Sequence, residues 1–114
     1  MILTTFTIEG KVKPKERPRK GKWGNFYTPK KTQEFEVRVW RSARDAGLST
    51  VSPDKKLGVK LKFWGMYGRS DIDNMAKTVL DGFKQYFNDN KVNLLIAEKL
   101  DSKEYKTEVT IWEL

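Results

Sequence analysis

The chain contains no cysteine and no histidine among its 114 residues. The absence of cysteine excludes a disulfide framework and any thiolate metal site. A hydrolase that lacks both residue types must activate water in another way, and a metal ion held by carboxylates is the obvious route. The amino terminus has no cationic signal segment, and no apolar run approaches membrane-spanning length. We therefore expect a soluble protein that acts in the cytoplasm.

The length and composition are those of one globular domain. The chain is 38% hydrophobic and 12% aromatic, which is enough apolar surface for a single core despite a charged fraction of 33%. There is no internal repeat and no change of composition that marks a boundary. We expect residues 1–114 to form one domain.

The positive charge is concentrated in one stretch, residues 11–31, which we call the basic window. This window has nine basic residues and one acid, whereas the rest of the chain has equal numbers of each. A local surplus of this kind indicates a polyanionic partner, with nucleic acid the leading candidate. Three aromatic residues in the window either contact DNA by stacking or wedging, or pin the loop to the core: Trp23, Phe26 and Tyr27.

Three stretches alternate apolar and polar side chains, which is the period of a half-buried β-strand. They span residues 2–9, 57–64 and 105–111. Residues 94–100 are largely apolar without a clear period, and they fit either a short helical turn or a strand. The prolines and glycines between residues 10 and 29 argue against a long regular element there.

Two stretches carry apolar residues at steps of three and four, which predicts amphipathic helices. The first begins at residue 29 or 32 and ends near residue 46, with Gly47 as its C-cap. The second begins near residue 71 and continues to residue 87. The order of elements predicts an α/β fold of the mixed α+β kind, a small mixed sheet of about four strands flanked by two main helices.

Acidic residues gather where the second strand-like stretch gives way to the second helix. Asp71 and Asp73 straddle this junction, and Asp89 follows the helix as a candidate third ligand. Carboxylate oxygens without nitrogen or sulfur donors suit hard divalent cations such as magnesium and manganese. Lys77 lies one turn after Asp73, where an ammonium group can offset charge on a phosphoryl oxygen. The pattern suggests metal-assisted hydrolysis of a phosphodiester.

A simpler interpretation of the same residues remains open. Ser70 and Asp73 approximate a capping box, acids in a first helical turn are common dipole partners, and Asp73 with Lys77 is an ordinary i, i+4 ion pair. Asp81, two turns after Asp73, is interpreted as a surface charge or as a residue behind the metal ligands, facing Lys77 and Lys84.

The motif also carries a family resemblance. The block Arg69-Ser70-Asp71-Ile72-Asp73-Asn74, followed by Lys77, Leu80-Asp81-Gly82 and Asn88-Asp89-Asn90-Lys91-Val92, resembles the RusA family of Holliday junction resolvases. The basic segment PKERPRKGKWGNFYTPKKTQEFE is similar to the corresponding part of that family. The resemblance implies a RusA-like fold and a homodimeric crossover junction endodeoxyribonuclease. It implies paired nicks near the crossover of four-way or branched DNA, in recombination and repair, with Mg²⁺ as cofactor and Mn²⁺ as a substitute.

By position, the resemblance implies metal-binding roles for Asp71, Asp73 and Asp89 and an essential role for Lys77. Many members have two consecutive aspartates at the third acidic position, where this chain has Asn88-Asp89. We assign the ligand to Asp89 because it keeps the spacing to Val92, although Asn88 can occupy that position in a shifted alignment. We expect the DNA contacts to come from the basic window and the motif: Lys13, Lys15, Arg17, Arg19, Lys20, Lys22, Lys30, Lys31 and Arg69.

Two alternatives stay open at this point. In the first, the protein is a non-catalytic DNA-binding or architectural module whose acids only cap a helix. In the second, it is a nuclease with broader specificity for branched DNA, because the metal site does not encode the choice of substrate. Dependence of DNA cleavage on a metal ion separates the first alternative from the nuclease.

Overall fold

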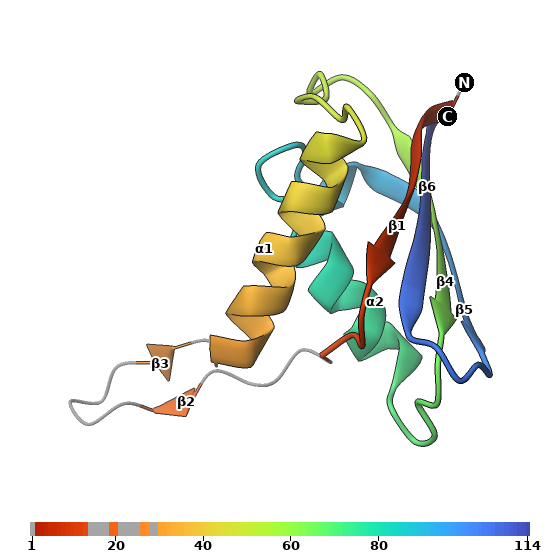
Figure 1. Cartoon of the computed structure of the whole chain (residues 1–114). Coiled ribbons are helices and arrows are strands. Elements are labelled where there is room, and N and C mark those ends of the chain that lie inside the picture. Colours follow the sequence, from red (N-terminus) through yellow and green to blue (C-terminus); the bar gives the residue numbers. More distant parts are fainter. Residues whose placement is uncertain (1, 14–18, 21–25, 28–29) are drawn as a thin grey trace.

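The computed structural model describes residues 2–13, 19, 20, 26, 27 and 30–114 (Figure 1). The mixed α+β prediction is confirmed, with a four-stranded sheet and two helices. The elements are, in chain order, β1 (Ile2–Glu9), β2 (Arg19–Lys20), β3 (Phe26–Tyr27), α1 (Lys30–Asp45), β4 (Leu57–Trp64), α2 (Ile72–Asp81), the 3-10 helix η1 (Asp89–Lys91), β5 (Val92–Leu100) and β6 (Lys106–Glu113).

The main sheet has the strand order β1-β6-β4-β5. β6 pairs antiparallel with both β1 and β4, whereas β4 and β5 run parallel from Leu57 beside Val92 to Trp64 beside Leu100. Parallel neighbours need a crossover connection, and α2 with its flanking loops provides it. Both helices lie on the same face of the sheet (Figure 1). The two-residue strands β2 and β3 form a separate small hairpin.

The core lies between this face of the sheet and the two helices. Every second residue of β4 is fully buried, as are Val109 and Ile111 of β6. Opposite them, Val39 of α1 and Met75 and Val79 of α2 are also fully buried. The alternating strands and the helical period of three and four therefore place their apolar faces against one another, and removal of these faces from water is the main force that holds the layers together.

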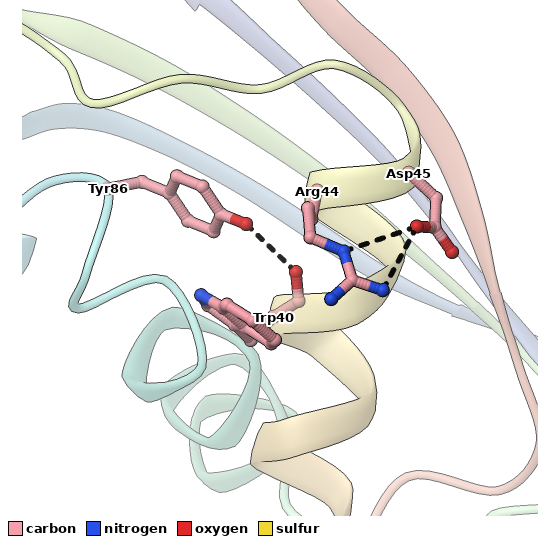
Figure 2. A network of polar contacts seen from close by, with 4 residues as sticks. All are labelled: Trp40, Arg44, Asp45 and Tyr86. Atoms are coloured by element: carbon pink, nitrogen blue, oxygen red, sulfur yellow. Dashed lines mark hydrogen bonds and ion pairs between the residues drawn. The ribbon is translucent and has the colours of Figure 1, made fainter.

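Helix α1 ends as predicted, at a glycine in the left-handed region. Gly47 has φ +87°, and the N–H of Leu48 donates to the carbonyl of Ala43 at 3.0 Å, which satisfies a carbonyl left over at the helix end. Near the same end, the hydroxyl of Tyr86 donates to the carbonyl of Trp40 at 3.0 Å (Figure 2). This bond ties α1 to the segment that follows α2.

Helix α2 is shorter than predicted. The apolar period suggested a helix to residue 87, but the helix ends at Asp81 and turns follow over residues 82–86. Phe83 and Phe87 are still buried, and their rings stack at 5.4 Å. A Cβ atom on Gly82 would lie 2.6 Å from Cβ of Val39, so the absence of a side chain lets α1 and α2 approach closely at this point. Glycine also weakens the helix there.

The structure settles the open assignment near the carboxyl terminus. Residues 94–100 belong to β5, a full strand at the edge of the sheet, rather than to a helical turn. The prediction that the basic window contains no long regular element before residue 29 is confirmed for the described part, where β2 and β3 have two residues each. None of the described helices is long and apolar enough to cross a membrane.

Candidate functional site

The loop between β4 and α2, residues 65–71, is held by contacts from the end of the sheet. We call it the acidic loop because it leads into Asp71. Gly65, with φ +152°, begins the loop, and its N–H donates to the carbonyl of Leu100 at 3.0 Å. The ammonium group of Lys99 donates to the carbonyls of Gly68 at 3.1 Å and Ser70 at 2.9 Å. A residue of β5 therefore fixes the backbone on both sides of Arg69.

Tyr67 anchors the middle of the acidic loop in the core. Its side chain is 6% exposed, and its hydroxyl accepts a hydrogen bond from the buried N–H of Val12 at 2.9 Å. Burial raises the pKa of the Tyr67 hydroxyl above its usual value, because the phenolate form would lose its hydration. Val12 lies at the start of the basic window, and the Lys11 ammonium lies 5.4 Å from the centre of the Tyr105 ring. The first residues of the basic window are thus attached to the acidic loop.

Asp71 and Asp73 lie together at the beginning of α2, and both are exposed. Asp71 occupies the N-cap position, but its side chain makes no capping hydrogen bond, and the predicted capping box of Ser70 and Asp73 is wrong. Asn74 contacts both acids: its side-chain amide donates to Asp71 at 3.4 Å, and its backbone N–H donates to Asp73 at 3.0 Å. The two carboxylates are therefore held next to each other while they still face solvent.

Further along α2, Lys77 is not the ion-pair partner of Asp73 that the simpler interpretation expects, and Asp81 is not a surface charge. Lys77 is exposed, and among the described residues it forms no ion pair with Asp73. Asp81 is not a surface charge, because its side chain is 7% exposed. The expected contact with Lys84 is present, at 3.8 Å. Lys77 thus keeps its ammonium group available for a ligand, whereas Asp81 belongs to the packing between α2 and its surroundings.

Asp89 lies at the other end of the sheet from Asp71 and Asp73. It is exposed at the start of η1, just before β5 begins at Val92, whereas the acidic loop contacts Lys99 near the end of β5. The strand from Val92 to Lys99 spans roughly 23 Å at the usual rise per residue. Accordingly, the described residues of one chain contain no group of three acids placed to hold a metal ion. The role of Asp89 as third ligand stays a prediction.

The predicted DNA-binding residues are only partly covered by the structure. Lys13 is exposed at the end of the segment that Val12 attaches to the acidic loop, and Arg69 is exposed within that loop. Arg19 and Lys20 form β2, and Lys30 and Lys31 begin α1. Three of the predicted DNA contacts lie outside the described part of the chain: Lys15, Arg17 and Lys22. Trp23, for which contact with DNA and attachment of the loop to the core were both open, also lies outside it.

Three residues that hold this site were not singled out from the sequence. Asn74 directly follows Asp73 and is three residues after Asp71. This closeness to two acids was the one feature of the sequence that could have predicted its role. Tyr67 and Lys99 gave no local signal, because Tyr67 acts through Val12, 55 residues away, and Lys99 acts on a loop about 30 residues away. Two surface grooves lie along α1, and Asp71 and Asp73 are exposed on the surface at the start of α2.

Comparison with known families gives one clear match. Residues 9–112, nearly the whole chain, match the family model of Endodeoxyribonuclease RusA. This range includes the basic window, the acidic loop, both helices and Asp89. A search of curated proteins found no match.

Proposed function

Because the chain belongs to the RusA family of endodeoxyribonucleases, which resolve Holliday junctions, we propose that the acidic loop and the start of α2 form its nuclease site. We further propose that the enzyme cuts four-way DNA by paired, magnesium-dependent nicks near the crossover. The observation that carries the site assignment is the geometry of Asp71. A residue in the N-cap position whose carboxylate does not cap the helix, and which accepts only one long hydrogen bond from Asn74, keeps oxygen lone pairs available for a ligand.

The donor atoms at this site fit a hard divalent cation. Asp71 and Asp73 offer exposed carboxylate oxygens, and the chain has no cysteine or histidine that would favour a softer metal. Enzymes of this family are generally dependent on a divalent metal, and we propose Mg²⁺ here, with Mn²⁺ as a substitute. When bound, the ion would supply a Lewis acid for the scissile phosphate and lower the pKa of a water molecule.

The chain's own residues have separate tasks in this proposal. Asn74 orients the two carboxylates through its amide and its backbone N–H. Lys77, exposed one turn further along α2, donates to a phosphoryl oxygen on which charge develops as the bond breaks. Arg69 and the basic window bind DNA phosphates and set the junction against the acids, with an affinity that falls as salt rises.

The position of Asp89 bears on the number of subunits in the site. Within one chain it lies roughly 20 Å or more from the acidic loop, given the length of β5 between them. If Asp89 completes the metal site, it does so in a second subunit, next to Asp71 and Asp73 of the first. We therefore propose that the enzyme is a homodimer whose sites each draw on both subunits. Two symmetric sites also suit a junction that offers two equivalent strands.

Two further assignments belong to this proposal. One continuous cluster of buried residues, contributed by both helices and the main sheet, supports a single RusA-like endonuclease domain over residues 1–114. Because the substrate is DNA undergoing recombination or repair, we place the enzyme in the cytoplasm of a bacterium or of a phage-infected cell.

The test is cleavage of a mobile four-way junction, beside duplex and flap controls, with Mg²⁺ and with EDTA. We expect paired nicks on the junction only when the metal is present. Asp73→Asn should lower the cleavage rate roughly 10²–10³-fold, the effect of removing one group that stabilises charge in a transition state. Junction binding in Ca²⁺ should be as tight as in the wild type or tighter, because a negative charge beside DNA is lost.

Asp54→Asn is the matched control, since Asp54 is an exposed acid in the loop before β4. It should cut at the wild-type rate. Binding without nicks in every metal would leave a DNA-binding module. Equal cutting of the flap would show broader specificity for branched DNA, and loss of binding by Asp73→Asn in Ca²⁺ would rule out a purely metal-binding role.

A further inference from the structure

A small notch, which we call the α1 notch, lies between α1 and the first residues of the basic window. Its volume is about 190 Å³, and the described residues that line it are Lys11, Lys13, Glu34, Phe35 and Arg38. Phe35 is buried, whereas the four charged residues are exposed. Pockets for drug-sized ligands usually measure about 300–1,000 Å³. The α1 notch therefore suits a chemical group of only a few atoms.

Arg38 of α1 is held in place by the backbone at the end of β1. Its Nη1 donates to the carbonyl of Glu9 at 3.2 Å. Gly10 has φ +98°, and a Cβ atom at this position would collide with Nη1 of Arg38. The absence of a side chain at Gly10 thus lets the guanidinium lie against the main chain. A guanidinium has several N–H donors, so this group is fixed in position and can still donate to a ligand.

The positive charges of the α1 notch are not neutralised within the described part of the chain. None of the ion pairs found there involves Lys11, Lys13 or Arg38, and Glu34 also forms none. The Lys11 ammonium lies 5.4 Å from the centre of the Tyr105 ring, a contact that places the charge without cancelling it. Three cations against one acid leave the notch with a net positive charge that suits an anion.

We propose that the α1 notch binds one backbone phosphate of the DNA substrate, through the guanidinium of Arg38 and the ammonium groups of Lys11 and Lys13. A phosphate group accepts charge-assisted hydrogen bonds on several oxygens, and the planar guanidinium matches two of them at once. This inference rests on the proposed function. It adds a residue outside the basic window, Arg38, to the surface that binds DNA, and it gives Lys11 and Lys13 a shared ligand.

Two hydrogen bonds connect the α1 notch with the acidic loop. Val12, the residue between the two lysines, donates its buried N–H to the hydroxyl of Tyr67 at 2.9 Å. Tyr105, beside Lys11, donates its hydroxyl to the carbonyl of Met66 at 3.1 Å. A phosphate bound in the notch is therefore held against the same loop that leads into the proposed metal ligands. In this role Arg38 is a positioning residue, because it fixes the DNA strand and takes no part in bond breaking.

The salt dependence of junction binding tests the site. Binding of the full chain to a four-way junction is measured by fluorescence anisotropy in Ca²⁺ from 50 to 200 mM salt. Arg38→Gln should lower the slope of log affinity against log salt by about 0.9, the contribution of one phosphate contact. Arg41→Gln is the matched control, since it makes the same change of charge in an exposed residue one turn further along α1. Its slope should stay near that of the wild type.

Glu34→Gln should change binding in the opposite direction. Removal of the only acid among the described residues of the notch should tighten junction binding about two- to fivefold at low salt, the effect of one charge near the surface. A purely structural role of Arg38 would lower the Tm of Arg38→Gln and leave the slope at the wild-type value. That result, an equal loss of slope in Arg41→Gln, or unchanged binding by Glu34→Gln would each overturn the proposal.

Inorganic phosphate distinguishes a DNA site from a site for a free anion. If phosphate added at constant ionic strength displaces the junction from wild type but not from Arg38→Gln, the notch binds a free anion and the proposal is overturned. Junction cleavage in Mg²⁺ is measured separately. The expected slopes without any nick would remove the proposed nuclease and keep the notch, whereas cleavage with an unchanged slope in Arg38→Gln would remove the notch and keep the nuclease.

Discussion

At the scale of single residues, an acidic side chain at the start of α2 can either cap the helix or bind a ligand. The partial positive charge at a helix N-terminus favours nearby carboxylates whether or not they accept a hydrogen bond from the first turn. Asp73 receives the N–H of Asn74, whereas Asp71 receives only a side-chain amide at 3.4 Å. Both acids are therefore stabilised in place, and neither is enclosed. This arrangement is compatible with the exchangeable metal ion proposed for the site.

Tyr67 provides a prediction on stability at this scale. Tyr67→Phe leaves the buried N–H of Val12 without its acceptor, which should cost about 1–3 kcal/mol of unfolding free energy. The folded pKa of Tyr67 is raised, so its contribution is complete below the unfolded pKa near 10 and is lost as pH rises through the folded value. Urea unfolding at neutral pH and above pH 10 measures both effects. The difference between wild type and variant should shrink at high pH.

Tyr105→Phe is the control for this prediction. The hydroxyl of Tyr105 donates to the carbonyl of Met66 in an exposed hydrogen bond, and water can replace it there. This variant should lose less stability than Tyr67→Phe. An equal loss in both variants would show that the buried N–H of Val12 is not the cause.

At the scale of elements, the acidic loop depends on a strand that follows it in the sequence. Lys99 at the end of β5 holds two carbonyls of the loop, and the next residue after Ser70 is Asp71. Lys99→Gln shortens the donor and removes its charge, so the loop should exchange its amide hydrogens faster and the cleavage rate should fall roughly 10–100-fold, as for other residues that orient metal ligands. Hydrogen exchange over residues 68–72 and junction cleavage are the two measurements.

Lys56→Gln is the matched control, with the same change of charge in an exposed lysine before β4. It should alter neither measurement, and Lys99→Arg should restore much of the rate because a guanidinium can reach both carbonyls. Slower cleavage by Lys99→Gln with unchanged exchange would mean that Lys99 acts on DNA and not on the loop.

The same elements explain how far the sequence alone could lead. Alternation located β1, β4 and β6 because each has one face on the core and one face away from it. It left β5 undecided, because Leu94, Leu95 and Ile96 are exposed on both faces and leave no period. The adjacency of Asp71 and Asp73 is local and was predicted. The remoteness of Asp89 follows from the parallel pairing of β4 and β5, which local patterns do not encode.

At the scale of the whole molecule, charge is distributed very unevenly. The basic window carries the entire formal net charge of +8, while the remainder is balanced. In Figure 1 the β2–β3 hairpin and the start of α2 lie toward the same end of the molecule. If the window binds DNA phosphates, as proposed, this arrangement brings them to the end of the molecule that carries the acids. A molecule built this way should bind the junction largely through release of counterions.

The last prediction concerns the salt dependence of junction binding. Each phosphate contact contributes about 0.9 to the slope of log affinity against log salt, so Arg17→Gln with Arg19→Gln should lower the slope by about 1.8 if both side chains contact phosphates. Junction binding is measured by fluorescence anisotropy in Ca²⁺ from 50 to 200 mM salt. A protein with many phosphate contacts loses roughly 10³–10⁵ in affinity over this range, so the change in slope can be resolved. Arg41→Gln with Lys56→Gln removes the same charge outside the window, from exposed residues. The slope of this control should stay near that of the wild type. An equal decrease in both double variants would mean that binding depends on net charge alone, and not on the basic window.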